Sequence, residues 1–277
     1  MTTRSVRSLL GLPLAAAVAL TMAACGVEVE KAGDPPDRAT ASGDTDANTD
    51  TKIETVKEGV LTVCTDPPYA PFEDTDGTEV IGFDIDLTTE VANDLGLDIE
   101  FVMPGFEAIE SAQAFDSGSC DVGASALTIT EARLAKLDFS DPYYKTTMGL
   151  LVKADSGIKT LADLTGKPVG VQQGTTGEDW ANEQPELTEI RQFETLGDQV
   201  TALKAGDVEG VFNDEPTLTP YVDEGFQVVS EFDTGEEFGF AVEKGNSALL
   251  DQINKTLDRL ESDGTYDELL AKWFAGA

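Results

Sequence analysis

The sequence predicts an α/β protein built on mostly parallel β-sheets. Short apolar runs typical of buried strands alternate with segments whose apolar residues recur at helical spacing, which is the pattern of strand–helix–strand units. The chain of 277 residues is long enough for two compact domains or one large one. Its hydrophobic content of 40% is enough for a packed core.

The folded part is predicted to begin near Gly59 with a buried strand. A helix then ends at Leu95, where Gly96 suits the C-terminal cap. The elements of this first unit are strands at 60–64, 99–102 and 121–124, with helices ending at 95 and spanning 108–115.

The second half of the chain continues the alternation. Strands are predicted at 148–152, 169–171, 207–212, 226–229 and 237–242, with helices near 158–167, 199–205 and 249–264. A last helix carries Tyr266 and Phe274.

Charge and composition exclude several classes of function. The chain has 53 acidic and 18 basic residues, a formal net charge of -35, which argues against a nucleic-acid partner. Because there is no histidine, a Ser-His-Asp triad, a Cys-His pair and an H-E-x-x-H zinc site are excluded. The runs around Asp46 and Asp76 do not complete a calcium loop, so neither a metal nor a cofactor is expected.

The first residues have the features of a targeting segment. Arg4 and Arg7 precede an apolar run at 9–19 that is short for a membrane span. The run Met22-Ala23-Ala24-Cys25 resembles a lipoprotein processing site. These features predict a lipoprotein signal peptide at 1–24 and a lipidated Cys25 that anchors the protein to the membrane. The alternative is a plain signal peptide with an incidental cysteine.

Residues 25–57 are rich in Asp, Thr, Gly, Pro and Ala and cannot form a core, so they are predicted to be a disordered acidic tether. Beyond the tether lie two cysteines, Cys64 and Cys120, in a chain expected to be exported to an oxidising compartment. They could pair. Parallel register between their strands could instead hold the sulfurs too far apart.

A stiff loop follows the first strand. It has three prolines, and it carries Asp66, Tyr69, Phe72 and Glu73. Ligands of open α/β sheets bind beyond the carboxyl ends of strands, which favours a ligand wall here. A structural proline corner with its aromatic rings in the core is the alternative.

The stretch 121–144 is predicted to be a strand, a polar turn and a short helix. Ser125, Thr128 and Thr130 lie at the strand end, and Arg133 lies just inside the helix start. A guanidinium at this position offers a planar fork of donors for a carboxylate. A surface arginine paired with nearby acids is the alternative.

Two further strand ends carry candidate ligand groups. Thr175 and Thr176 follow Gly174 where a helix begins, so their hydroxyls and free N–H groups can hold an anion, or simply cap the helix. Asp214 lies just beyond the strand predicted at 207–212.

Several phrases in order along the chain together resemble one family, the extracellular solute-binding proteins of family 3, which are amino-acid receptors of ABC importers. The phrases are TDPPYAPFE, GFDIDL, GASALTITEAR, DFSDPYY, LADLTGKPVGVQQGTT, ALKAGDVEGVFNDEP and LESDGTYDELLAKWF. The resemblance implies a periplasmic-binding-protein-like fold, with two α/β lobes around a cleft and two hinge strands. Lobe 1 would comprise 58–146 plus 239–277, and lobe 2 would comprise 147–238.

The resemblance also implies roles for individual residues. Arg133 would pair with the ligand's α-carboxylate, with help from Thr128 and the N–H of Thr176, and Asp214 would take the α-ammonium. Asp66, Tyr69, Phe72 and Phe106 would line the side-chain space, while Ser125 and Ala126 would offer backbone groups. Glu73 adds a further acid, and no second basic residue is evident in these motifs.

The expected function is therefore that of a monomeric, non-enzymatic receptor on the extracytoplasmic face of the cell membrane. It would deliver a polar amino acid to a membrane permease after hinge closure, with arginine or lysine preferred and glutamine second. A sensor lipoprotein and a dehydratase-type enzyme on the same scaffold are the alternatives.

Overall fold

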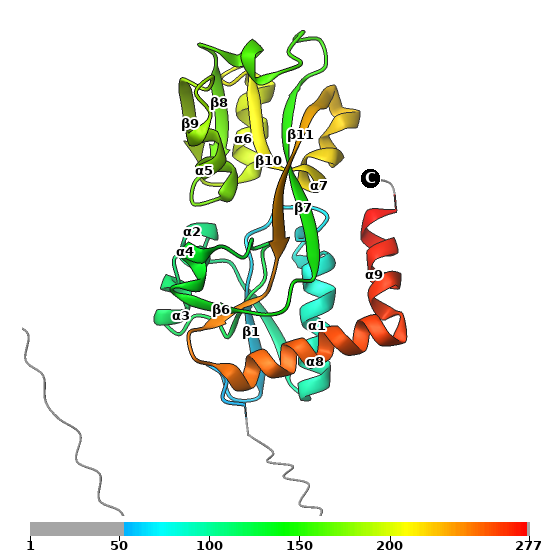
Figure 1. Cartoon of the computed structure of the whole chain (residues 1–277). Coiled ribbons are helices and arrows are strands. Elements are labelled where there is room, and N and C mark those ends of the chain that lie inside the picture. Colours follow the sequence, from blue (N-terminus) through cyan, green and yellow to red (C-terminus); the bar gives the residue numbers. More distant parts are fainter. Residues whose placement is uncertain (1–52, 276–277) are drawn as a thin grey trace, which may run out of the picture. The chain divides into compact units, whose positions relative to one another are not determined.

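The structure, a computed structural model, describes residues 53–275, apart from the side chains of residues 223 and 224. The predicted signal peptide, the predicted lipidation at Cys25 and most of the predicted tether lie outside this range. Within it, no helix is both long and apolar enough to cross a membrane. The predicted α/β fold is confirmed, with helices flanking two five-stranded sheets (Figure 1).

The first sheet has the strand order β4-β1-β5-β12-β6. Its strands are β1 (Val60–Cys64), β4 (Asp98–Val102), β5 (Val122–Gly123), β6 (Leu137–Phe139) and β12 (Ala241–Glu243). Strand β1 runs parallel to β4 and β5, whereas β12 is antiparallel to both of its neighbours. The sheet is therefore mixed rather than mostly parallel, because a strand from late in the chain returns to its interior.

Helices and a hairpin accompany the first sheet. They are β2 (Asp74–Asp76), β3 (Glu79–Ile81), α1 (Phe83–Leu95), α2 (Phe106–Glu110), α3 (Gln113–Asp116), α4 (Glu131–Leu134), α8 (Ser247–Asp263) and α9 (Thr265–Phe274). As predicted, Gly96 caps α1 in a left-handed conformation. Gly82 precedes α1 at φ 146, where a Cβ would lie 2.0 Å from the carbonyl oxygen of Phe72, so only glycine fits.

The second sheet has the order β11-β7-β10-β8-β9. Its strands are β7 (Tyr144–Lys153), β8 (Pro168–Gln172), β9 (Glu189–Phe193), β10 (Gly210–Asp214) and β11 (Phe226–Phe238). The helical elements are η1 (Leu161–Leu164), α5 (Thr176–Glu183), α6 (Leu196–Ala205), α7 (Glu215–Leu218) and η2 (Thr219–Glu224). Strand β8 is parallel to β9 and β10, while β7 is antiparallel to β10 and β11.

Strands β7 and β11 connect the two sheets, as the green and brown strands at the centre of Figure 1 show. The end of β11 meets the segment that follows β5 through a bridge between Thr128 and Phe238. Aromatic rings fill this crossing: Phe72 lies edge-on to Tyr144 and Phe238, with ring centroids 5.0 and 5.1 Å away. Phe274 of α9 stacks on Tyr144, so the end of the chain packs on the crossing strands.

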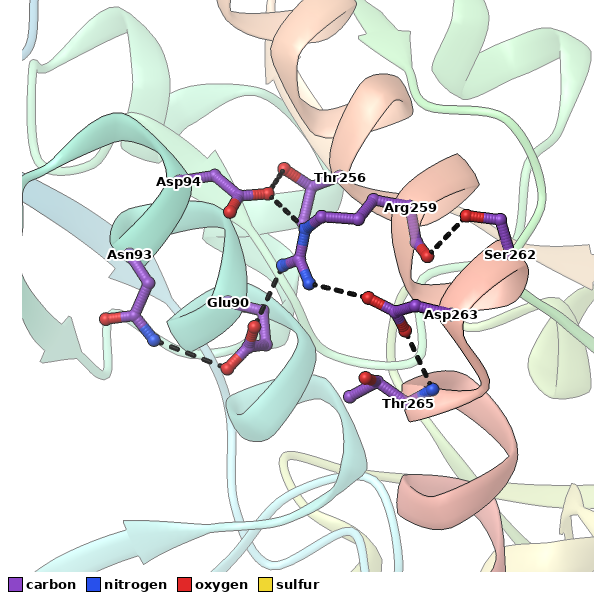
Figure 2. A network of polar contacts seen from close by, with 8 residues as sticks. All are labelled: Glu90, Asn93, Asp94, Thr256, Arg259, Ser262, Asp263 and Thr265. Atoms are coloured by element: carbon purple, nitrogen blue, oxygen red, sulfur yellow. Dashed lines mark hydrogen bonds and ion pairs between the residues drawn. The ribbon is translucent and has the colours of Figure 1, made fainter.

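Arg259 ties α8 to α1 (Figure 2). Its Nε donates to Asp94 and one terminal nitrogen donates to Glu90, both at 2.8 Å. Asp94 also accepts from the hydroxyl of Thr256 at 2.9 Å, and Asp263 accepts from the other terminal nitrogen of Arg259. Each of the three nitrogens of this guanidinium therefore has a partner within the structure.

The predicted helix at 108–115 is wrong in one respect, because the chain breaks it into α2 and α3. Ala112 lies at the break with φ 73. Both Ile109 and Phe115 pack on Gly123, where an added Cβ would lie 2.9 and 3.0 Å from their side chains. Six residues apart, the two side chains would point to different faces of one continuous helix, so the break brings both onto the sheet.

Cys64 and Cys120 form a disulfide, which settles the alternatives left open by the sequence. Their Cα atoms lie 5.7 Å apart. Cys120 precedes β5, and the chain bends at Asp121 before it enters that strand. The parallel register that pairs Cys64 with Gly123 therefore does not extend back to Cys120.

Two strand boundaries also differ from prediction. Strand β10 begins and ends later than 207–212, so Asn213 and Asp214 are its last residues rather than residues beyond it. The strands predicted at 226–229 and 237–242 are instead the long β11, with two register shifts, and the short β12.

Candidate functional site

Arg133 is buried at the meeting point of the two sheets. Thr130 caps α4 and accepts the N–H of Arg133, and the arginine side chain is 5% exposed. The guanidinium donates to the carbonyl oxygens of Thr128 and Gly174, each at 2.9 Å, and its Cζ lies 5.4 Å from the ring centroid of Phe106. The alternative of a surface arginine is therefore wrong.

A narrow cavity opens beside this guanidinium, and eight of the twelve predicted ligand residues line it. These are Tyr69, Phe106, Ala126, Thr128, Arg133, Thr175, Thr176 and Asp214, with Gln172 as an additional lining residue. The first five belong to the segment before β7. Of the others, Gln172 ends β8, Thr175 and Thr176 follow it, and Asp214 ends β10. The cavity thus lies between the two sheets.

Asp214 supplies the negative charge of the cavity. It is 6% exposed, and Oδ2 accepts from the hydroxyl of Tyr69 at 2.6 Å. The same hydroxyl lies close to Asn213, while Oδ1 of Asp214 has no hydrogen-bond partner within residues 53–275. Burial raises the pKa of Asp214 to about 7, and the charge of Glu236 raises it further. The hydroxyls of Tyr69 and Thr146 and the charge of Arg133 lower this pKa. A cation that reached Oδ1 would favour the charged carboxylate.

Asp66 lies behind the cavity lining and contacts it through Gln172. The amide nitrogen of Gln172 donates to Asp66 at 3.3 Å and to the carbonyl of Glu194 at 3.1 Å. Its amide oxygen is buried without a partner in the part of the chain that the structure describes. Burial raises the pKa of Asp66 to about 6, opposed by hydrogen bonds from the Phe106 N–H and from Gln172.

Glu73 and Ser125 lie outside the cavity, behind the turn that forms one of its walls. Glu73 is fully buried and accepts from the Ser125 hydroxyl. Asp84 accepts from the N–H of Ala126 and from the hydroxyl of Tyr143, both at 2.8 Å. Ala126 adopts φ 43, so these two acids hold a turn that a non-glycine residue rarely adopts.

The two acids behind the turn, Glu73 and Asp84, have raised pKa values. Burial, and then the charge of Asp84, raise the pKa of Glu73 well above its usual range. Burial raises the pKa of Asp84 to about 7, against the hydrogen bonds from Ala126 and Tyr143. Asp84 was not among the predicted site residues. The signal that could have found it is an acid at the start of α1, a helix that packs on β1.

Phe72 also lies outside the cavity, in the aromatic core described above. For Phe72 the alternative interpretation of the proline loop holds, whereas Tyr69 of the same loop points to Asp214.

Thr175 lines the cavity and also caps α5. Its hydroxyl accepts the N–H of Glu178 at 3.2 Å and donates to the carbonyl oxygen of Gln172 at 2.8 Å. The Thr176 hydroxyl lies 3.5 Å from that of Thr128, across the cavity.

Gln172 is the lining residue that sequence reasoning missed. It ends β8, and the rule that ligands bind at strand ends applies to it as it does to Asp214. Within residues 53–275 no group of three or more acidic or cysteine side chains could hold a metal ion. The arrangement is a buried cation and a buried anion facing one small space, which suits a zwitterion.

The chain is similar in sequence to known binding proteins. The sequence profile of the bacterial extracellular solute-binding proteins, family 3, matches residues 61–276. The chain is 34% identical over 218 residues to a probable histidine-binding protein of Campylobacter jejuni, covering 77% of this chain and 84% of that protein. It is 33% identical over 218 residues to the ABC transporter glutamine-binding protein GlnH of Bacillus subtilis, covering 77% and 80%.

Solved structures of binding proteins are also similar to this chain. An ancestral arginine-binding protein bound to glutamine matches with a TM-score of 0.74 and 40% identity, covering 79% of this chain and 99% of that chain. An ancestral arginine-binding protein bound to arginine matches with a TM-score of 0.73 and 40% identity, covering 78% and 98%. These four similar proteins are binding proteins rather than enzymes.

Proposed function

Because the chain belongs to the bacterial extracellular solute-binding proteins of family 3, we propose that it captures a polar amino acid for an ABC importer. The observation that carries this proposal is the pair of opposite charges at one cavity. Arg133 and Asp214 are both buried and line the same space, Arg133 on α4 beside the first sheet and Asp214 at the end of β10 in the second. An amino acid carries the complementary carboxylate and ammonium.

In this proposal each polar group of the cavity has a role. Arg133 binds the α-carboxylate, with the Thr128 hydroxyl and the Thr176 N–H as further donors. The free Oδ1 of Asp214 accepts from the α-ammonium. Charge-assisted hydrogen bonds contribute about 1.5–3 kcal/mol each, so three or four support micromolar binding after the cost of ordering.

The proposed ligand is a cationic amino acid, arginine or lysine, with glutamine second. Arg133 is the only basic side chain among the lining residues in the described part of the chain. In this proposal it pairs with the ligand's α-carboxylate. An acidic ligand side chain would therefore approach Asp66 and Asp214 without a counter-charge. The free amide oxygen of Gln172 and the carboxylate of Asp66 offer acceptors to a side chain rich in N–H groups.

Capture is proposed to occur by hinge closure. The moving lobes would be 58–146 plus 239–277 and 147–238, with β7 and the end of β11 as the hinge strands. A ligand that bonds Arg133 on one lobe and Asp214 on the other favours the closed form, because only that form makes both contacts. The closed monomer would then deliver its ligand to a membrane permease, held near the membrane by the acyl chains of Cys25.

Calorimetry of the purified protein against the twenty amino acids tests the proposed function. We expect saturable binding of arginine, lysine or glutamine and none of glutamate. Tight glutamate binding without arginine binding would overturn the ligand assignment, and no binding of any amino acid would overturn the function. For the anchor, C25S should move the protein from the membrane fraction to the soluble fraction of cells that express it.

A further inference from the structure

Glu110 lies near Nε of Arg133, whereas Thr128 and Gly174 accept from the two terminal nitrogens. Glu110 was not among the predicted site residues. It is the last residue of α2, whose first residue is Phe106. Residues four apart share one face of a helix. Phe106 lies against the guanidinium, and Oε2 of Glu110 lies 3.8 Å from its Nε.

The donors of Arg133 are unequally occupied. Each terminal nitrogen carries two hydrogens, and the carbonyls of Thr128 and Gly174 take one hydrogen from each of these nitrogens. Nε faces Glu110 at ion-pair distance. One hydrogen on each terminal nitrogen is therefore left for a ligand carboxylate, on a guanidinium that already has an anionic neighbour.

Glu110 also lies close to the turn between β8 and α5. A Cβ added to Gly174, which has φ +77, would lie 3.4 Å from both Cγ and Oε1 of Glu110. The carboxylate is thus enclosed between α2, Arg133 and the turn that precedes α5, and its side chain is 18% exposed. At this depth the interaction between two carboxylates is screened less than on an open surface.

Charges of both signs act on Glu110. Burial raises the pKa of Glu110, and the charges of Arg133 and then Lys136 lower it, while Glu107 and Asp179 raise it further. Burial in turn lowers the pKa of Arg133, and Glu110 is the largest opposing charge. Glu110 and Arg133 therefore stabilise each other in the absence of a ligand.

From this geometry we propose that Glu110 sets the affinity of the site by competing with the ligand's carboxylate for Arg133. This inference rests on the proposed function. Binding places a second carboxylate on a guanidinium that Glu110 already shares, and the repulsion between the two anions weakens the complex. Glu110 is thus a positioning residue that acts through Arg133. With Glu110 present, the affinity for the amino acid is lower than Arg133 would give without it.

The test compares E110Q with the wild-type protein, using L-arginine and L-argininamide as calorimetric ligands, and L-glutamine with L-glutaminamide as the second pair. Glutamine at position 110 keeps the shape of the side chain and removes its charge. We expect E110Q to bind the amino acid roughly fivefold more tightly, the size of effect that a partly exposed charge pair produces. Binding of the amide should stay within about twofold, because the amide has no carboxylate to repel.

The matched control is E107Q, which removes an exposed carboxylate of the same helix and should leave both affinities unchanged. E110D, which withdraws the carboxylate from Arg133, should give a smaller gain and serves if E110Q fails to fold. Unchanged or weaker amino-acid binding by E110Q, or an equal gain for the amide, would overturn the competition. Failure of the proposed function looks different, because the wild-type protein would then bind none of the four ligands.

Discussion

Arg133 and Asp214 face the same cavity, but the protein holds them in different ways. The guanidinium donates to carbonyl oxygens of the segments that follow β5 and β8, and it lies against Phe106 and Glu110. Asp214 has Tyr69 on one oxygen and no partner on the other within the described residues. The cationic end of the site is therefore preorganised, while the anionic end is incomplete until a cation arrives.

The largest expected effect comes from removing the preorganised end. R133A deletes two charge-assisted hydrogen bonds to the ligand carboxylate, so amino-acid affinity should fall on the order of a hundredfold or more. Calorimetry measures the loss. R191A, which removes an exposed arginine of β9, is the control and should bind normally. If R133A kept its affinity, the carboxylate would bind elsewhere.

Removing the charge of the incomplete end should cost less. D214N leaves an amide that still accepts a hydrogen bond but has no charge for the ammonium, so affinity should fall roughly twentyfold. The same variant should bind the deaminated analogue of the ligand as well as the wild-type protein does. A matching loss with the deaminated analogue would show that D214N acts through the fold rather than through the ammonium.

The buried acids in and behind the site also predict how stability depends on pH. Asp84 and Asp214 have pKa values raised to about 7, and Asp66 to about 6, so the folded protein binds more protons than the unfolded chain. The free energy of unfolding should therefore fall as pH rises from about 4 through about 7. Thermal unfolding without ligand should give a higher Tm at pH 5 than at pH 8.

A control variant tests whether Asp214 is one source of that slope. D214N should make Tm less sensitive to pH across the same interval, whereas D116N, an exposed substitution on α3, should leave the slope unchanged. A wild-type Tm that rose toward pH 8 would contradict the raised pKa values of these buried acids.

The smallest expected effect comes from the hydroxyl that links the loop after β1 to Asp214. Y69F removes a hydrogen bond of about 0.5–1.5 kcal/mol, so affinity should fall about threefold to tenfold. F72L, in the same loop but in the aromatic core, should lower Tm without changing affinity. Equal effects of the two variants on affinity would mean that the loop acts only as a scaffold.

Sequence reasoning located the strand ends better than the directions of side chains. Arg133, Asp214 and Thr176 were predicted from the rule that ligands bind beyond strand ends, supported by the family resemblance, and all three line the cavity. Phe72 and Glu73 were placed in the same site but lie behind it. A loop with three prolines has no periodicity, so the sequence does not tell which of its side chains face inward.

The misses depend on long-range geometry. Glu110 reaches Arg133 because it lies four residues after Phe106 on α2, on the same helix face. The predicted helix began at residue 108, so it did not pair Glu110 with Phe106. Asp84 supports Ala126 from a separate helix, 42 residues away in sequence. The disulfide depends on a bend at Asp121 that no local pattern announced.

The position of β12 has a consequence for how the chain acquires its structure. β12 lies between β5 and β6, yet all five strands of the second sheet separate it from them in the sequence. During synthesis from the N-terminus, the first sheet therefore lacks the strand between β5 and β6 until residues 241–243 have been added. The second sheet, at 144–238, is continuous and can form earlier. The bond between Cys64 and Cys120 lies wholly in the early part of the chain, so it can secure β1 to the approach of β5 while the final strand is still being made.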